Sequence, residues 1–97
     1  MADVTVVIDG DGNFTPGNIR PNPGDKVTFE SPDDDVVLCV TTAAVFGQNR
    51  YEIPTGAALT VTVKEDAINV GFGLSVQVGT LEGDCGGARG NGNETGP

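Results

Sequence analysis

Residues 12–29, GNFTPGNIRPNPGDKVTF, contain the signals that decide the fold of this chain. Pro23 presets the backbone angle φ of a type II turn, and Gly24 accepts the positive φ that the next position of such a turn requires. The strand that follows the turn places Val27 and Phe29 on one face, because side chains alternate along a strand. The stretch therefore predicts a turn and a strand at the corner of a β-sheet.

The first half of that stretch, from Phe14 to Ile19, is a short segment interrupted by a proline. Proline cannot donate a hydrogen bond to a central strand, so such a segment is typical of a sheet edge. We expect four apolar side chains of the corner to enter the core: Phe14, Ile19, Val27 and Phe29.

The rest of the chain adds short apolar segments separated by turns. Residues 68–78 alternate most regularly, and the glycines within them indicate a bend, a bulge or a close neighbour, so that two strands are one possible arrangement. With 15 glycines and 6 prolines, and with many valines and threonines, the composition favours strands and turns over helices. We therefore predict an all-β sandwich of about seven to eight strands. The other expected strands cover residues 4–8, 36–40, 51–54 and 59–63, and the apolar face of residues 68–78 comprises Ile68, Val70, Phe72, Leu74, Val76 and Val78.

The chain is strongly acidic. Its 97 residues include 14 acidic and 5 basic side chains, for a net charge of −9. Such a surface repels phosphate groups, which excludes nucleic acid and anionic membrane surfaces as partners. No apolar run approaches the roughly 20 residues of a membrane span, so we expect no membrane insertion. The charge is explained by solubility, or by a specific cation or a basic protein as partner.

Cys39 and Cys85 are the two cysteines of the sequence. They could form one disulfide, which would close a loop of about 47 residues and stabilise the fold by roughly 4 kcal/mol in the loop-entropy model. The alternative is a buried thiol on a strand at Cys39 and an exposed thiol at Cys85, and the sequence leaves both open. Because it contains no histidine and no CxxC pair, it does not support a zinc or thioredoxin-like site.

The apolar alternation does not return after Gly79. The sequence changes to Gly-Gly, Gly-Asn-Gly-Asn and a final Gly-Pro, which is typical of flexible linkers. We therefore expect a sandwich domain over residues 1–79 and a flexible glycine-rich tail or linker over residues 80–97.

Two acidic stretches are candidates for binding calcium, a cation that takes oxygen ligands at alternate positions. Residues 9–13 resemble the start of a calcium loop, but Phe14 stands where that loop needs glycine and Arg20 where it needs glutamate. A hairpin turn is the preferred interpretation there, and a solvated acidic loop is preferred for residues 33–35. If both emerged at one end of the sandwich, they could cooperate on a weakly bound divalent cation. The candidate ligands are Asp9, Asp11, Asn13, Asp33, Asp34 and Asp35.

The sequence contains no catalytic constellation. Ser31 and Ser75 lack a histidine base, and the acidic residues lie in turns without sign of a low-dielectric pocket that would raise a pKa. Cys39 lies in an apolar run, where a thiol is usually inert. We expect no enzymatic activity, no catalytic residue and no cofactor.

The corner at residues 12–29 resembles the start of the cupredoxins, such as plastocyanin. The shared pattern is Gly12-x-Phe14-x-Pro16-x-x-Ile19 followed by Pro23-Gly24-Asp25-x-Val27-x-Phe29. A later turn and strand, Ile53-Pro54-x-Gly56 and Leu59 to Val63, resemble the family's next turn and strand. The resemblance covers roughly residues 4–78 and implies a Greek-key arrangement of the sandwich.

The copper site of that family does not carry over. Its type 1 copper is bound by two histidines, a cysteine thiolate and a weak axial ligand such as methionine. Here the register of the first histidine falls near Val37, and Cys39 lies two positions further. The late Cys-x-x-His-x-x-x-Met loop is replaced by residues 69–74, NVGFGL. The resemblance therefore implies the fold and not the metal.

We expect a non-catalytic, metal-free, cupredoxin-like binding or structural module that presents acidic loops or an edge strand to an unknown protein partner. The alternative is a copper-binding or electron-transfer protein with a non-standard site that uses Cys39 or a ligand from another chain. A third hypothesis is an immunoglobulin-like adhesion domain, which differs in strand order. The resemblance favours a secreted, periplasmic or cell-surface location, although Met1-Ala2-Asp3 leads straight into a strand without a signal peptide.

Overall fold

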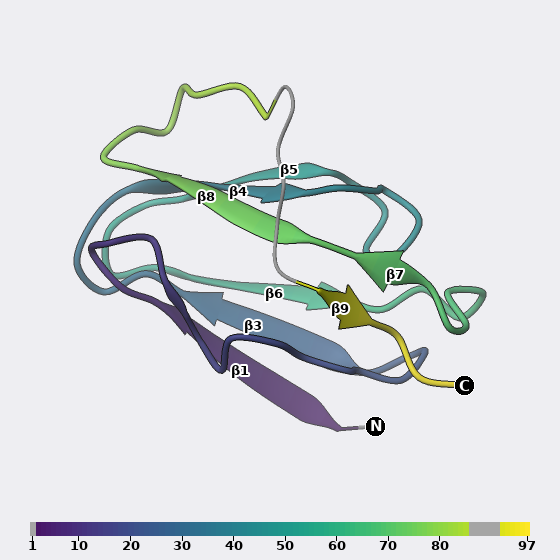
Figure 1. Cartoon of the computed structure of the whole chain (residues 1–97). Coiled ribbons are helices and arrows are strands. Elements are labelled where there is room, and N and C mark those ends of the chain that lie inside the picture. Colours follow the sequence, from purple (N-terminus) through teal and green to yellow (C-terminus); the bar gives the residue numbers. More distant parts are fainter. Residues whose placement is uncertain (1, 86–91) are drawn as a thin grey trace.

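The computed structural model describes residues 2–85 and 92–97. Four strands form one sheet in the order β2-β1-β3-β6, three form a second sheet in the order β5-β4-β8, and β7 pairs with β9 (Figure 1). The described residues include no helix that is long and apolar enough to cross a membrane. The strands are β1 (Asp3–Ile8), β2 (Phe14–Thr15), β3 (Lys26–Glu30), β4 (Val36–Val40), β5 (Arg50–Ile53), β6 (Ala58–Thr62), β7 (Gly71–Phe72), β8 (Leu74–Val78) and β9 (Asn93–Glu94).

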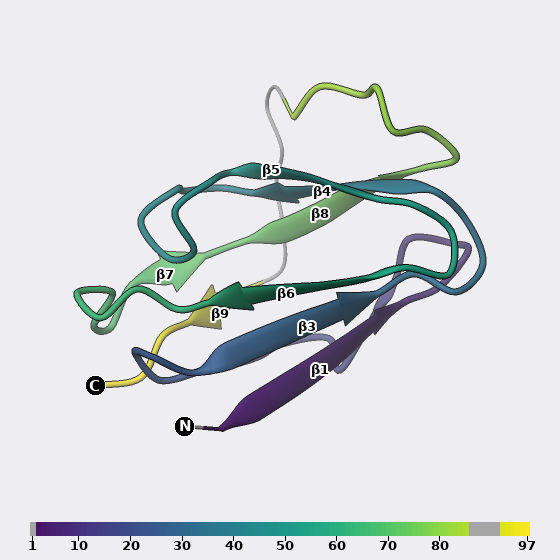
Figure 2. The same cartoon turned by 180° about the vertical axis from the view of Figure 1, so that it is seen from behind.

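The two larger sheets lie face to face, which confirms the predicted all-β sandwich (Figures 1 and 2). Their inward side chains form one core, in which Phe29 is fully buried. Its ring meets Phe46 edge to face, with centroids 6.2 Å apart, and Phe46 meets Phe72 in the same way at 5.6 Å. Ile19 and Val27 are buried as expected, whereas Phe14 is only half-buried and packs against the rim of the core.

The corner forms the predicted type II turn. Gly24 has a φ of 87°, and the N–H of Asp25 donates to the carbonyl of Asn22 at 3.0 Å. The Asp25 carboxylate is buried, and its two oxygens accept the backbone N–H groups of Ala2 at 3.1 Å and Asn22 at 2.9 Å. It therefore ties the start of β1 to the start of β3, its parallel neighbour in the sheet.

The chain passes between the two sheets at one end of the sandwich. Residues 31–35 carry it from β3 in the first sheet to β4 in the second, and residues 54–57 bring it back from β5 to β6. The two connections are bonded to each other, because Gly56 donates its N–H to the carbonyl of Ser31 at 2.7 Å. This end holds the site described below.

The strand β4 is buried on both faces, which accounts for its continuous apolar sequence. Val36, Leu38 and Val40 face the core between the sheets. Val37 and Cys39 lie on the other face of the strand, and they are buried as well. Their cover is the segment 80–85, which runs across the outside of the second sheet (Figure 1).

The end of the chain differs from the expected flexible tail. Residues 93 and 94 form β9, and Asn93 and Thr95 are buried. Thr95 exchanges two hydrogen bonds with Val70, through its backbone N–H at 2.9 Å and its hydroxyl at 2.8 Å. The expected domain boundary at residue 79 is therefore corrected, since residues 80–85 and 92–97 pack on the sandwich. The part of the expected tail at residues 86–91 lies outside the described residues.

The alternation predicted for residues 68–78 is broken at both of its ends. Ile68 is 55% exposed and Val78 is 38% exposed, so neither belongs to the core. Ile68 lies in a turn, where its N–H bonds to the carbonyl of Asp66 at 3.1 Å and where the next residue, Asn69, has a φ of 54°. The strands begin only at Gly71, and they are two, β7 and β8, which is one of the arrangements that the glycines left open.

Candidate functional site: an acidic end and a free sheet edge

The two acidic loops lie side by side at one end of the sandwich. A side-chain carbon built on Gly10, in the turn after β1, would lie 3.2 Å from Oδ2 of Asp34 and 3.8 Å from Oδ2 of Asp33. The sequence left the relative position of these loops open, and the structure brings them together.

The first loop uses its leading aspartate to hold its own turn. Oδ1 of Asp9 accepts the backbone N–H groups of Asp11 and Asn13, both at 2.9 Å. Gly12, with a φ of 83°, donates its N–H to the carbonyl of Asp9 at 3.1 Å. This is the hairpin turn preferred from the sequence, in which an aspartate bonds to the backbone two residues ahead. The Asp11 and Asn13 side chains are exposed.

The second loop is joined to the return connection by Asp35. Its Oδ1 accepts the backbone N–H of Thr55 at 2.8 Å and the Thr55 hydroxyl at 2.9 Å. These two hydrogen bonds, the backbone one most of all, lower the pKa of Asp35 below its ordinary value because they favour the charged carboxylate. Asp35 therefore fixes the connection from which β6 starts.

The acidic side chains are not gathered around one point. Among residues 2–85 and 92–97, no three histidine, cysteine, aspartate or glutamate side chains form a group that could hold a metal ion. Asp33 and Asp34 approach Gly10, whereas Asp35 is directed to Thr55. The aspartates among the calcium candidates thus share an end of the molecule without sharing a ligand sphere.

The two cysteines are joined. Cys39 and Cys85 form a disulfide with an S–S distance of 2.06 Å and Cα atoms 5.5 Å apart. Arg50 holds the same segment by donating from Nε to the carbonyl of Gly83 and from Nη2 to the carbonyl of Leu81, both at 2.9 Å. The disulfide and the arginine together fix residues 80–85 over β4.

The disulfide bears on the copper hypothesis. Copper of the type 1 kind takes a thiolate ligand, and a sulfur in a disulfide is not a thiolate. Neither Cys39 nor Cys85 is free in this structure. Val37, at the register of the family's first histidine, is fully buried within β4.

The strand β6 lies at the edge of the first sheet, next to β3 alone among the described strands. Val63, just beyond it, points both backbone groups towards β3, because its N–H bonds to the carbonyl of Asp25 and its carbonyl accepts the N–H of Gly24, each at 2.9 Å. Backbone groups alternate in direction along a strand. The residues whose N–H and C=O groups point away from β3 are therefore Ala58, Thr60 and Thr62.

This edge is left open between its two ends. The N–H of Lys64 donates to the carbonyl of Val45 at 2.8 Å, which covers the edge just beyond β6. Along β6 itself, no neighbouring strand in the described part of the chain takes up the outward groups. Figure 2 shows β6 at the front of the molecule, with β5 above it.

Strands β2 and β5, at two other sheet edges, carry features that oppose strand addition, and β6 does not. The edge strand β8, LSVQV, shares with β6 a length of five residues and the lack of charge, proline and glycine. Strand β2 is two residues long and runs into Pro16. Strand β5 bears an ion pair, in which Nη1 of Arg50 lies 2.8 Å from Oε2 of Glu52. Short strands, prolines and charges are the usual protection of sheet edges. The β6 sequence, ALTVT, is five residues long and has no charge, proline or glycine.

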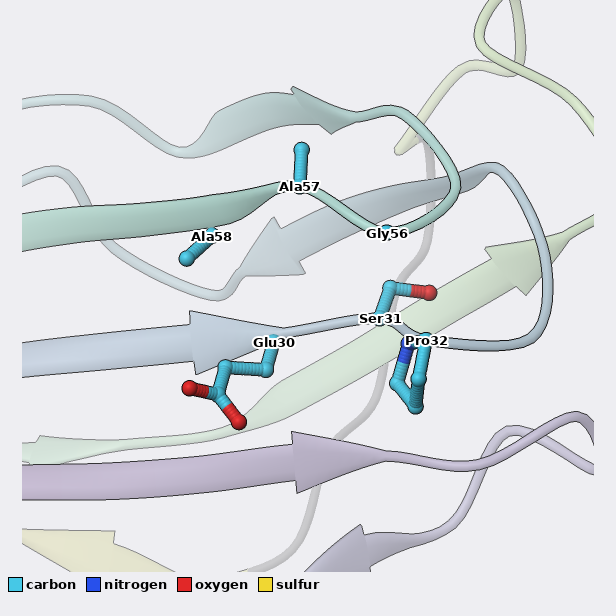
Figure 3. A pocket seen from close by; sticks show the side chains of 6 residues that line it. All are labelled: Glu30, Ser31, Pro32, Gly56, Ala57 and Ala58. Atoms are coloured by element: carbon cyan, nitrogen blue, oxygen red, sulfur yellow. The ribbon is translucent and has the colours of Figure 1, made fainter.

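An open pocket of about 260 Å³ lies at the start of β6 (Figure 3). It is bounded by the end of β3 and by the connection into β6. Its one charged group is the carboxylate of Glu30. Figure 3 shows the Glu30 and Ala58 side chains on the same side of the sheet, with Ala57 directed to the opposite side. The residues that line the pocket are Glu30, Ser31, Pro32, Gly56, Ala57 and Ala58.

The Ser31 hydroxyl near this end serves the structure, and the Tyr51 phenol lies by the backbone of Gln48, in the connection from β4 to β5. The Ser31 hydroxyl donates to the carbonyl of Asp34 at 2.6 Å, inside the acidic loop. Tyr51 is half-buried, and its burial raises the pKa of the phenol. Among the described hydrogen bonds and ion pairs, none joins either hydroxyl to a basic side chain.

The sequence indicated an edge strand as a docking surface, but it did not indicate which strand this is or that Glu30 and Ala58 share a pocket. The alternation of β6 shows which of its side chains face outwards, and it indicates an exposed threonine-bearing face. The sequence does not show that β6 lies at an edge, because this depends on which distant strands pair with it. Glu30 and Ala58 are 28 positions apart, and only the register of β3 against β6 places them opposite each other.

The fold and the site can be compared with known proteins. No protein-family model matches the chain, and no curated protein matches it.

Proposed function

We propose that the chain is a non-catalytic, metal-free, cupredoxin-like binding module that receives an extended strand of a protein partner on β6. The observation that carries the proposal is the row of outward N–H and C=O groups at Ala58, Thr60 and Thr62, on a strand without charge, proline or glycine. Each such group forms a hydrogen bond readily when an extended peptide lies beside it.

The rigidity of the edge supports this use. Strand β6 is bonded along its whole length to β3, and the connection before it is fixed by Thr55 on Asp35 and by Gly56 on Ser31. A preformed strand loses little conformational freedom when a partner adds to it, so more of the interaction energy remains as affinity. The acidic loops lie at the end of the sandwich where β6 starts, and they would give a negative charge to the surface beside a bound strand.

The cupredoxin-like character of the module is supported by the corner on which the resemblance was based. Its Gly-Asp-x-Val-x-Phe segment forms the end of the turn and most of β3, with Val27 and Phe29 in the core. The loss of the family's histidines and the pairing of Cys39 with Cys85 support a role without copper. A Greek-key order of the strands remains part of the proposal.

The test compares what the wild-type protein and two edge variants capture from an extract of the native source. Thr60→Pro removes one outward N–H that the sheet does not use, and Thr60→Lys places a charge on the edge. Thr60→Ala keeps the N–H and is the matched control. Circular dichroism confirms that each variant folds. The proposal predicts a protein retained by wild type and Thr60→Ala and lost from both other variants. Equal retention by all four would contradict it.

A further inference from the structure

We infer that the partner strand carries a basic residue beside Ala58, whose side chain lies in the pocket with its charged end on Glu30. This inference rests on the proposed function, because it concerns the strand that β6 receives. It names the chemistry of the partner: an extended, cationic peptide segment with an arginine at this position.

The register of the sheet places the two residues of the pocket in one row. Glu30 on β3 is directly opposite Ala58 on β6, and both side chains are exposed on the outer face of the sheet. A strand added to β6 would continue this row with a third residue on the same face. Because Ala58 has only a methyl group, the side chain of that third residue can pass over it towards Glu30.

The distances suit a long side chain. Neighbouring strands in a sheet lie about 4.8 Å apart, so the backbone of the added strand would lie about 10 Å from the backbone of Glu30. An extended arginine and an extended glutamate span this separation together. A short side chain on the partner would leave both the pocket and the carboxylate unused.

The lining of the pocket suits the two halves of a basic side chain. Pro32, Gly56 and Ala58 present small apolar surfaces, against which the alkyl stem of a lysine or arginine packs. Within the described residues Glu30 forms no ion pair, the one such pair being that of Arg50 with Glu52. Arginine is favoured over lysine because its planar guanidinium donates two parallel hydrogen bonds to a carboxylate.

The charge of the molecule decides between a cationic partner and a second copy of this chain. Each copy carries a net charge of −9, and Glu65 and Asp66 add exposed carboxylates beyond the far end of β6. Pairing two β6 edges would bring these like charges together, which opposes association. A cationic strand meets acidic groups at both ends of the edge. The positive charges that oppose it are Lys64, just beyond β6, and Lys26, opposite Thr62.

The experiment uses synthetic peptides as probes of the edge. Seven-residue peptides of alternating valine and threonine carry either arginine or citrulline at one outer-face position, and citrulline keeps the shape of arginine without its charge. Binding is followed through the amide resonances of ¹⁵N-labelled protein, for wild type, Glu30→Gln and the matched control Glu65→Gln. The control removes one exposed carboxylate beyond the far end of β6, outside the pocket.

We expect the arginine peptide to bind wild type roughly tenfold more tightly than the citrulline peptide, because it gains charge-assisted hydrogen bonds to Glu30. Glu30→Gln should reduce this ratio to near one, and Glu65→Gln should preserve it. If both peptides shift the β6 amides with equal affinity, the basic-residue inference is wrong while strand addition stands. If neither peptide shifts those amides, or if β6 is already occupied by a second copy, the proposed function fails as well.

Discussion

The side-chain oxygen Oδ1 of Asn93 accepts the backbone N–H of Ile19 at 2.7 Å, joining two residues that are 74 positions apart. Both residues are buried. The bond places the last residues of the chain beside the corner that organises the fold, and β9 continues the contact by pairing with β7. The end of the chain is therefore part of the sandwich.

Asn93→Ala should destabilise the fold by about 1–3 kcal/mol, because the buried N–H of Ile19 would lose its acceptor. The measurement is the free energy of unfolding in urea. Glu94→Ala, at the exposed neighbour within β9, is the matched control and should change stability by no more than about 0.5 kcal/mol. Equal effects of the two variants would show that β9 does not dock as described.

Phe29→Ala should cost about 3–5 kcal/mol, because it removes a fully buried ring that also packs edge to face on Phe46. The neighbouring Thr28→Ala changes the outer face of the same strand, where its hydroxyl meets that of Thr60 at 2.9 Å, and should cost much less. Urea denaturation of both variants measures the difference. A loss under about 1 kcal/mol for Phe29→Ala would mean that the corner is not built into the core.

Reduction of the disulfide between Cys39 and Cys85 should lower stability by roughly 4 kcal/mol, as the entropy of closing its loop predicts. The measurement is the denaturation midpoint with and without a reductant. The double variant Cys39→Ala with Cys85→Ala serves as the control, because a reductant should not change its midpoint. A wild-type midpoint that is insensitive to the reductant would contradict a bonded pair.

The contribution of Asp35 should depend on pH in a defined direction. Its pKa is lowered in the folded state by the two hydrogen bonds from Thr55, so its stabilisation is complete above the ordinary pKa of 3.8 and is lost as the pH falls through the folded value. The stability difference between wild type and Asp35→Asn should therefore be constant near neutral pH and shrink below pH 3.8. Thermal unfolding as a function of pH measures it.

Asp33→Asn is the control for this experiment, because it removes a carboxylate of the same loop while leaving the bonds to Thr55 in place. The stability difference between Asp33→Asn and wild type should not show the decrease below pH 3.8 that is expected for Asp35→Asn. A difference for Asp35→Asn that persists unchanged into strong acid would contradict the bonding described at Thr55.

The sequence was informative where structure depends on neighbouring residues. The turn at Pro23 and Gly24 and the strand that contains Val27 and Phe29 follow from local backbone preferences and from alternation, and the structure has both. Residues 71–78 divide into two strands at Gly73, one of the arrangements that the glycines left open.

It was uninformative where structure depends on distant partners. The docking of residues 92–97 uses a buried asparagine and a buried threonine in a glycine-rich segment, so no apolar pattern marks it. The segment that covers Val37 is held by the disulfide and by Arg50. Both contacts join residues that are far apart in the sequence, so no local pattern indicates them. The pocket between Glu30 and Ala58 depends on the register of two strands that are separated by two others in the chain.

Amide hydrogen exchange along β6 tests the central claim most directly. In the free protein, the outward N–H groups of Ala58, Thr60 and Thr62 should exchange rapidly, and those of Leu59 and Val61, which bond to β3, should be protected. Addition of the captured partner should slow exchange at Ala58, Thr60 and Thr62. If the partner binds while these three amides keep exchanging as fast as before, no strand is added to β6 and the proposed function is contradicted.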